Sequence, residues 1–140
     1  MSRTTRAQSF TSTQKTSEAF SDFLDNFDQS PIGNQLARVV NERSVSQSIR
    51  NLIMTNVGER LFQPTVGSNT NHSLFEINDN VTAVAIETYV ASTIKNFEPR
   101  ANLISVIVQE NDNEVSITIT YSLINNPTPI TLNFILQRVR

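Results

Sequence analysis

The sequence predicts an α+β domain of two layers, in which two main amphipathic helices pack on a C-terminal antiparallel three-strand meander. Two stretches with apolar residues at helical spacing, 45–53 and 86–97, precede a region in which apolar and polar residues alternate. The chain has 140 residues, and its hydrophobic fraction of 38% is enough for one modest core. We therefore expect one domain over 21–140.

The N-terminal end of the chain has a different composition. Residues 1–20 are rich in Ser, Thr and Gln with few large apolar groups, so we expect a flexible tail outside the domain. A short acidic stretch follows, and its apolar residues predict a strap laid on the domain or on a neighbour: Phe20, Phe23, Leu24 and Phe27. Beyond it, Leu36, Val39 and Val40 indicate an additional short N-terminal strand within 35–40.

The first helix is expected to begin at Ser44. This residue is a good N-cap, and Gln47 follows at the spacing that closes a capping box. The apolar stripe over 45–53 then lies on one face of the helix. Gly58 is expected to end the helix, because glycine readily adopts the left-handed conformation that follows a C-cap.

The connection after this helix, residues 59–68, contains proline and glycine and is expected to be irregular. Leu61 and Phe62 are its large apolar residues, and we expect them to anchor it on the core. A second apolar anchor is expected at Leu74 and Phe75.

The second helix is expected to begin at Asp79 or Asn80 and to carry its apolar stripe over 86–97. Pro99 sets its end, because proline cannot continue a helix and also restricts the residue before it. We therefore expect the helix to stop one or two residues before Pro99.

Three strands are expected after the second helix. Residues 103–109 form a nearly continuous apolar run, and 111–113 supply turn residues. Apolar and polar residues alternate over 115–123, which is the pattern of a strand with one buried and one wet face. Residues 125–129 contain two prolines and are expected to break that strand. The alternation then resumes with Ile130, Leu132, Phe134 and Leu136.

Charge and composition argue against several classes of function. Lys plus Arg number 11 against 13 Asp plus Glu, so the net charge of −2 gives no positive field that would favour nucleic acid. No stretch approaches the roughly 20 apolar residues of a membrane helix, so we expect no membrane partner. The chain has no cysteine and only one histidine, His72, which is interpreted as a solvated loop residue. We therefore expect no metal site and no cofactor.

Catalytic chemistry has little support, and we expect no catalytic residues. The sequence contains no phosphate-binding loop, dinucleotide fingerprint or nucleophile elbow. A carboxylate pair for glycoside cleavage could be drawn only from Glu59, Glu76, Glu87 and Glu98. Tryptophan is absent and tyrosine scarce, so a sugar cleft would lack its usual aromatic platforms. Glu87 is better explained by the solvated face of the second helix.

The segment Glu98-Pro99-Arg100 lies where the second helix is expected to give way to the first strand of the meander. Pro99 fixes the backbone, and an extended geometry would project the side chains of Glu98 and Arg100 from the same side of the chain. Two interpretations are open on spacing alone. The segment is either a recognition pair on a stiff corner, or a local network completed by Glu98 with Arg100 as a solvated residue before an apolar strand.

Several motifs occur together in a fixed order along the chain. They are Ser44-Val45-x-x-Ser48-Ile49-x-Asn51-Leu52, Thr55-x-x-Gly58-Glu59-Arg60-Leu61-Phe62-x-Pro64, Gly67-Ser68, Leu74-Phe75-Glu76 and Glu98-Pro99-Arg100. Together they resemble the small baseplate wedge subunit of contractile phage tails. That family includes the matching baseplate component of type VI secretion systems, and its domain is often labelled lysozyme-like. The resemblance runs from about Asp22 to Arg140 and leaves residues 1–20 outside it.

The resemblance implies a structural protein of the virion tail baseplate, assembled in the host cytoplasm, and not an enzyme. Its expected partners are other baseplate wedge proteins and the tail sheath subunit. In such a protein, Glu98 and Arg100 would be polar contacts, with Pro99 as their spacer, at a corner that docks on the helical core bundle of neighbouring wedge subunits.

The resemblance also implies a sheet edge to which sheath arms add strands, so that the protein helps to initiate the sheath. Independently, a short meander that ends in a C-terminal strand leaves unpaired backbone at its margins. The strand expected to face the sheath carries Ile130, Leu132, Phe134, Leu136 and Arg138. Two rival functions stay open: a peptidoglycan-degrading lysozyme-like enzyme, and a regulatory binding module like the anti-adaptor relatives of this domain.

Overall fold

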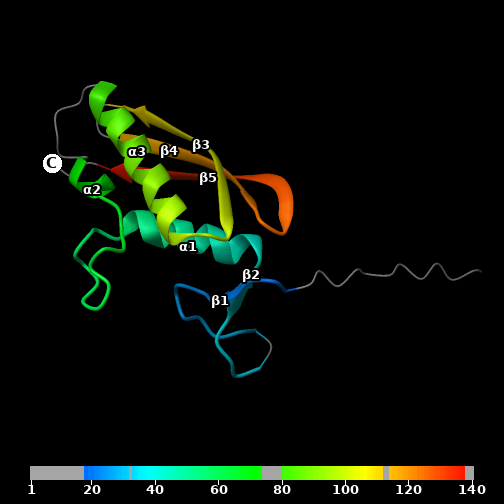
Figure 1. Cartoon of the computed structure of the whole chain (residues 1–140). Coiled ribbons are helices and arrows are strands. Elements are labelled where there is room, and N and C mark those ends of the chain that lie inside the picture. The colour runs from blue at the N-terminus through cyan, green and yellow to red at the C-terminus, as the bar shows by residue number, and fades with distance from the viewer. Residues whose placement is uncertain (1–17, 32, 74–79, 112–113, 138–140) are drawn as a thin grey trace, which may run out of the picture.

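The computed structural model describes residues 18–31, 33–73, 80–111 and 114–137. Along the chain the elements are β1 (Ser21–Phe23), β2 (Arg38–Val40), α1 (Glu42–Met54), α2 (Thr70–Ser73), α3 (Asn80–Phe97), β3 (Ala101–Glu110), β4 (Glu114–Leu123) and β5 (Asn126–Gln137). The fold is α+β, as the sequence predicts, because α1 and α3 pack on a three-stranded antiparallel sheet of order β3-β4-β5 (Figure 1).

A single buried cluster joins the helices to the inner face of the sheet. Its members come from α1, α3 and all three strands: Val45, Ile49, Ile53, Ile86, Val90, Ile94, Ala101, Val115, Ile117, Ile119, Tyr121, Leu123, Phe134 and Leu136. Burying one large aliphatic side chain stabilises a fold by about 1.5–3 kcal/mol. The Tyr121 hydroxyl also lies 2.7 Å from the Ser46 hydroxyl, so a hydrogen bond ties β4 to α1.

The first helix starts directly after Asn41, earlier than the sequence predicts. Asn41 has a positive φ of 50°, and its side chain makes no capping hydrogen bond to the helix. Its Oδ1 atom instead accepts from the backbone N–H groups of Ala19 and Phe20, at 2.9 and 3.3 Å. Asn41 therefore fixes the N-terminal strap to the start of α1.

The predicted capping box between Ser44 and Gln47 is also wrong, because the helix already begins at Glu42. Ser44 lies inside the first turn, where it is fully buried, and no described residue hydrogen-bonds its hydroxyl. The Gln47 side chain donates to the Phe23 carbonyl at 2.7 Å and does not turn back on the helix. Tertiary contact with the strap therefore overrides the local capping pattern, because it engages Gln47 and leaves Ser44 inside the helix.

The end of α1 also differs from the prediction, because the helix stops at Met54 and not at Gly58. Thr55 is extended, its N–H donates to the Asn51 carbonyl at 3.0 Å, and its carbonyl accepts from Ser68 N–H at 2.8 Å. The returning connection thus closes the helix end. Gly58, with φ of 91°, lies in the turn that follows.

The end of α3 agrees with the prediction from Pro99. The helix runs to Phe97, and its last N–H bond joins Glu98 to the Ile94 carbonyl at 2.9 Å. The backbone then enters β3 at Ala101. The proline therefore makes an abrupt turn between helix and strand.

The segment before α3 is only partly described. The expected cap at Asp79 and the expected anchor at Leu74 and Phe75 lie outside the described residues. The short helix α2 was not predicted, and it carries His72, which is exposed on this helix and does not lie in a loop.

The sheet confirms the alternation predicted for its central strand, since every second side chain of β4 is buried along its whole length. Both neighbours pair with it in antiparallel register, with a shift between Leu103 and Ser105 in β3. The strand break predicted over 125–129 is wrong in part, because β5 already begins at Asn126 and includes Pro127 and Pro129. The prolines are tolerated because β5 is an edge strand. On the side of β5 that faces away from β4, a residue without an N–H group removes no hydrogen bond from the sheet.

The predicted N-terminal strand exists as half of a small hairpin. Residues 38–40 form β2, which pairs with β1 in a two-stranded sheet beside α1 (Figure 1). A second contact holds this strap, because Asn51 of α1 donates to the Asp25 carboxylate at 2.9 Å. Phe23 and Phe27 nevertheless remain more than half exposed, at 52% and 67%.

Candidate functional site

The corner between α3 and β3 is fixed on both sides by backbone hydrogen bonds. Ala101 N–H donates to the Glu98 carbonyl at 3.2 Å, and the Arg100 carbonyl accepts from Ile124 N–H at 3.2 Å. Pro99 itself is exposed. The Glu98-Pro99-Arg100 segment, which we call the Arg100 corner, is therefore a rigid feature of the surface.

The side chains of Glu98 and Arg100 lie on the same side of the chain, as predicted, and they bind each other. Arg100 Nε lies 2.6 Å from Glu98 Oε1, and Arg100 Nη2 lies 2.8 Å from Glu98 Oε2, so two of the three guanidinium nitrogens bond the two carboxylate oxygens. The Glu98 side chain is 2% exposed and the Arg100 side chain 31%. Glu98 therefore orients Arg100, and the outward part of the pair belongs to Arg100.

The protonation states of this pair are set by their surroundings. Burial raises the pKa of the Glu98 carboxyl, but hydrogen bonds from Arg100 and Ser48 and the charge of Arg100 outweigh burial, so this pKa lies below its usual value. The hydrogen bond to Glu98 raises the pKa of Arg100. The pair is thus ionised at neutral pH.

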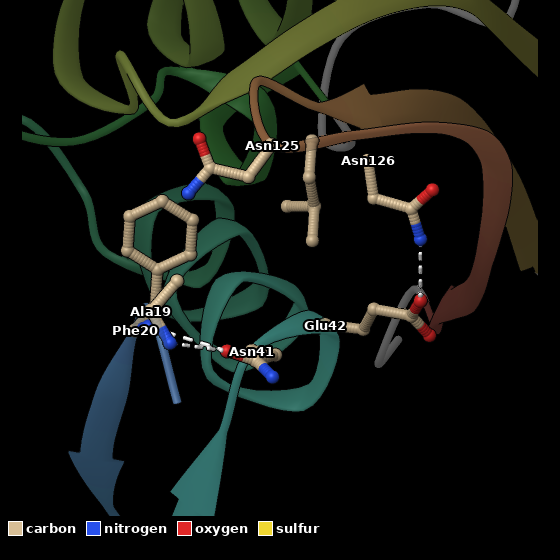
Figure 2. Close-up of a pocket in the computed structure, with 7 residues that line it drawn as sticks. Ala19, Phe20, Asn41, Glu42, Asn125 and Asn126 are labelled. Atoms are coloured by element: carbon tan, nitrogen blue, oxygen red, sulfur yellow. Dashed lines mark hydrogen bonds between the residues drawn. The ribbon is translucent and has the colours of Figure 1, made fainter. Parts of the chain in front are cut away.

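The strap completes the surroundings of Arg100. The guanidinium carbon lies 5.6 Å from the centre of the Phe20 ring, within the range of a cation–π contact. Phe20 also lines a cleft of about 430 Å³ between the strap and the turn from β4 to β5 (Figure 2). At the far end of this cleft, Asn126 donates to the Glu42 carboxylate at 3.4 Å (Figure 2). Ordering of the strap and placement of Arg100 are therefore linked.

A second exposed feature contradicts the sequence-based expectation for the connection after α1. Leu61 and Phe62, expected as core anchors, are 92% and 96% exposed and form what we call the apolar tip. They cannot pack inward because the loop that carries them closes on itself. Gly58 N–H donates to the Pro64 carbonyl at 2.8 Å, and the Glu59 carboxylate accepts from Asn56 N–H at 2.7 Å.

The base of this loop is held against the helices. Gly67 has φ of 140°, and a Cβ atom there would lie 2.7 Å from the Thr55 carbonyl oxygen. The Gly67 carbonyl accepts from the buried Thr93 hydroxyl of α3 at 3.2 Å. The apolar tip is therefore presented on a loop with a fixed base. In the sequence, Leu61 and Phe62 follow no helical or strand period, so nothing there distinguishes an exposed pair from a buried anchor.

The residues expected to face the sheath occupy β5, but their side chains point into the domain. Phe134 and Leu136 are 8% and 5% exposed, and Ile130 and Leu132 are partly buried against the core. Arg138 lies outside the described residues. What β5 can offer a partner is therefore its backbone edge.

Three of the four carboxylates considered for catalysis lie in the described part of the chain, and each of these is already engaged in a hydrogen bond. Glu98 binds Arg100, Glu59 accepts from a backbone N–H of its own loop, and Glu87 accepts from Val108 N–H at 3.3 Å. Glu76 lies outside the described residues. None of the helices in the described part of the chain has the length and apolar content needed to cross a bilayer.

Comparison with known proteins identifies the family. The sequence profile of the family described as Baseplate wedge protein gp25 matches residues 39–128. Baseplate wedge protein gp25 of Enterobacteria phage T4 is 32% identical over 97 residues, which span 68% of this chain and 74% of that protein. The chain belongs to the gp25 baseplate wedge protein family. Its membership makes it a structural protein of the tail baseplate.

Solved structures of other proteins have a similar fold. A crystal structure of a Geobacter sulfurreducens protein described as a "putative tail lysozyme" is 26% identical, with a TM-score of 0.67 over 74% of this chain and 98% of that one. A chain of the type VI secretion system baseplate complex shares the fold at 14% identity, with a TM-score of 0.58 over 70% of this chain and 93% of that one. The gp25 profile ends within β5, just before Pro129.

Proposed function

We propose that this gp25-family protein docks on neighbouring baseplate wedge proteins through the Arg100 corner and helps to initiate the tail sheath by accepting an added strand at β5. No catalytic role is assigned to it. The observation that carries the docking proposal is the Arg100 guanidinium, held by a buried carboxylate and only partly covered.

The chemistry of the corner suits recognition of another protein. Glu98 occupies one edge of the guanidinium fork, and the remaining N–H donors of Arg100 are available for backbone carbonyls or a carboxylate of a partner. Because Arg100 is already ordered by Glu98 and Phe20, binding costs little side-chain entropy. Glu98 acts in this proposal as a positioning residue and not as a direct contact.

The apolar tip supplies a second contact for the same docking. Large apolar side chains that are almost wholly exposed on a fixed loop are typical of residues buried by a partner. A groove of about 420 Å³ lies between the loop and the end of α3, and it is lined by Arg60, which precedes the apolar tip in sequence, and by Phe97, which precedes Glu98. We therefore place the apolar tip and the Arg100 corner in one docking surface.

Strand addition is supported by the position of β5 in the sheet. β5 is an edge strand, so alternate N–H and C=O groups point away from β4, and no strand from the described residues lies beyond them. An extended arm of the sheath subunit could pair with those groups, as in other cases of β-augmentation.

The docking proposal needs a variant that keeps the fold. Arg100→Ala is unsuitable, because it would leave Glu98 buried without its partner and cost about 3–5 kcal/mol. The double variant Glu98→Gln with Arg100→Gln removes both charges together. We expect it to stay folded and to lose co-purification with neighbouring wedge proteins, whereas Arg50→Gln, on an exposed position of α1, retains it. Unimpaired assembly of the double variant would remove the corner from the interface.

The rival functions are separated by two further measurements. An enzyme would clear peptidoglycan, and Glu98→Gln or Glu76→Gln would abolish the clearing without unfolding the protein. A regulatory module would bind a response regulator and no tail protein. We expect neither result.

A further inference from the structure

The sheet has two edge strands, β3 and β5, and strand addition could begin at either one. The geometry points to residues 130–137 of β5 as the open edge, with Glu87 closing the edge of β3. This inference rests on the proposed strand addition, and it specifies where the added strand binds and what kind of segment it is.

The outer margin of β3 is already engaged by α3. Glu87 Oε1 on that helix accepts from Val108 N–H at 3.3 Å, across 21 residues of sequence. An N–H of an edge strand that bonds a helix side chain is one that does not take part in the ladder with its neighbour. A strand arriving at β3 would have to displace this carboxylate and leave it without its donor.

A register shift between Leu103 and Ser105 interrupts β3 a second time. Such irregularities change the spacing of the outward N–H and C=O groups, and proteins use them to protect edges. A groove of about 720 Å³ does open between α3 and the first residues of β3, where Ala101 and Leu103 line it. The shift separates this short uncovered stretch from the remainder of the strand, so it offers too few consecutive groups for a stable added strand.

Over its second half, the edge of β5 is neither hydrogen-bonded by a helix side chain in the described residues nor interrupted by a register shift. From Ile130 to Gln137 the strand pairs with β4 without a shift, from Tyr121 to Glu114. These eight residues contain no proline and no charged side chain, which is the composition of an edge that pairs readily. Before them, Pro127 and Pro129 have no N–H to donate, so they stop an added ladder near Ile130.

The exposed and buried sides of this stretch define the segment that would fit. Phe134 and Leu136 face the core, whereas Asn133 and Ile135 lie on the exposed face. Residues on neighbouring strands pair side by side. The partner is therefore an extended segment of up to about eight residues, free of proline in its middle, with apolar residues at the alternate positions that continue the core face.

The absence of cysteine allows a direct test with the full-length chain. Ile135→Cys on β5 and Ile107→Cys on β3 are matched positions, because both are exposed isoleucines, at 59% and 50%, on the same face of the sheet. Each variant would be oxidised with the sheath subunit of the same tail, carrying single cysteines along its terminal arms. We expect the Ile135→Cys disulfide yield to exceed that of Ile107→Cys by about tenfold, a ratio equal to about 1.4 kcal/mol.

Variants of Glu87 test whether this residue closes the edge of β3 to an added strand. In the Ile107→Cys background, Glu87→Ala removes the acceptor and should raise the yield several-fold, whereas Glu87→Gln keeps an acceptor oxygen and should change it little. Equal yields at the two strands, or a higher yield at Ile107→Cys, would overturn the closed β3 edge while leaving strand addition intact. Specific disulfides at neither strand would contradict the proposed strand addition itself.

Discussion

The guanidinium of Arg100 forms two hydrogen bonds to the carboxylate of Glu98, with N–O distances of 2.6 and 2.8 Å, although only Pro99 separates the two residues in sequence. The proline ends α3 and turns the backbone so that both side chains project together. The spacing of the pair allows two interpretations, a local network or a recognition site. In the folded structure the two are compatible, because the local network with Glu98 holds the partly exposed Arg100 in place.

This pair predicts a dependence of stability on pH. The folded-state pKa of Glu98 lies below the unfolded value of about 4.3, so its contribution is fully present above that value and is lost as the pH falls through the folded-state pKa. In urea unfolding, the stability difference between wild type and Glu98→Gln should therefore be largest near neutral pH and shrink toward pH 3. Glu18→Gln, at an exposed site, should show little such change. A difference between wild type and Glu98→Gln that stays constant down to pH 3 would contradict the assignment.

The exposure of the apolar tip predicts that substitutions there leave the stability of the fold almost unchanged. Leu61→Ser with Phe62→Ser removes two almost fully exposed side chains, so the free energy of unfolding should change by no more than about 0.5 kcal/mol. By contrast, Phe134→Ala in the core should cost about 3–5 kcal/mol. If the double variant were destabilised as strongly as the core variant, the tip would have to pack inward, contrary to its exposure.

Two glycines with positive φ predict different costs of substitution. Gly58→Ala adds a Cβ in open space, so the cost is the backbone strain alone, about 1 kcal/mol. Gly67→Ala adds the same strain and also places a Cβ 2.7 Å from the Thr55 oxygen and 2.9 Å from the Asn56 carbonyl carbon. We expect Gly67→Ala to cost at least about 1 kcal/mol more than Gly58→Ala in chemical unfolding. Equal costs would show that the loop base moves freely.

Ser44 provides a direct comparison between the sequence-based cap and the observed one. Removing a true N-cap serine costs about 0.5–2 kcal/mol. Because the Ser44 hydroxyl is buried and no described residue hydrogen-bonds it, Ser44→Ala should instead leave the stability unchanged or increase it. Asn41→Ala should destabilise the protein, since it frees two strap N–H groups. A clear loss of stability in Ser44→Ala would restore the predicted capping box.

Elements with a strong period were predictable from sequence. The alternation that ends in Leu123 placed β4 and its buried face, and Pro99 placed the end of α3, because each depends on local geometry that tertiary contacts leave unchanged. The helix boundaries at Asn41 and Met54 were not predictable in this way. They depend on the strap and on the returning loop, which lie far away in sequence.

The candidate site was predictable in its residues and less so in their roles. Spacing placed Glu98 and Arg100 on one side of the chain, but only the folded structure distinguishes the buried partner from the exposed one. Leu61 and Phe62 were assigned to the core because apolar residues are most often buried, and their exposure reflects loop closure that composition does not encode. Likewise, the role of Glu87 at the edge of β3 depends on how α3 lies beside that strand.

The order of elements along the chain has a consequence during synthesis. The ribosome releases α1 and α3 before the strands that cover their apolar stripes, and the last strand still contributes Phe134 and Leu136 to the core. Translation proceeds at about 5–20 residues per second. During this time the nascent chain exposes the apolar stripes of two helices before the sheet that buries them has been made. Premature termination before β5 would release a product that lacks Phe134 and Leu136 and cannot complete its core, so a folded subunit requires translation through β5.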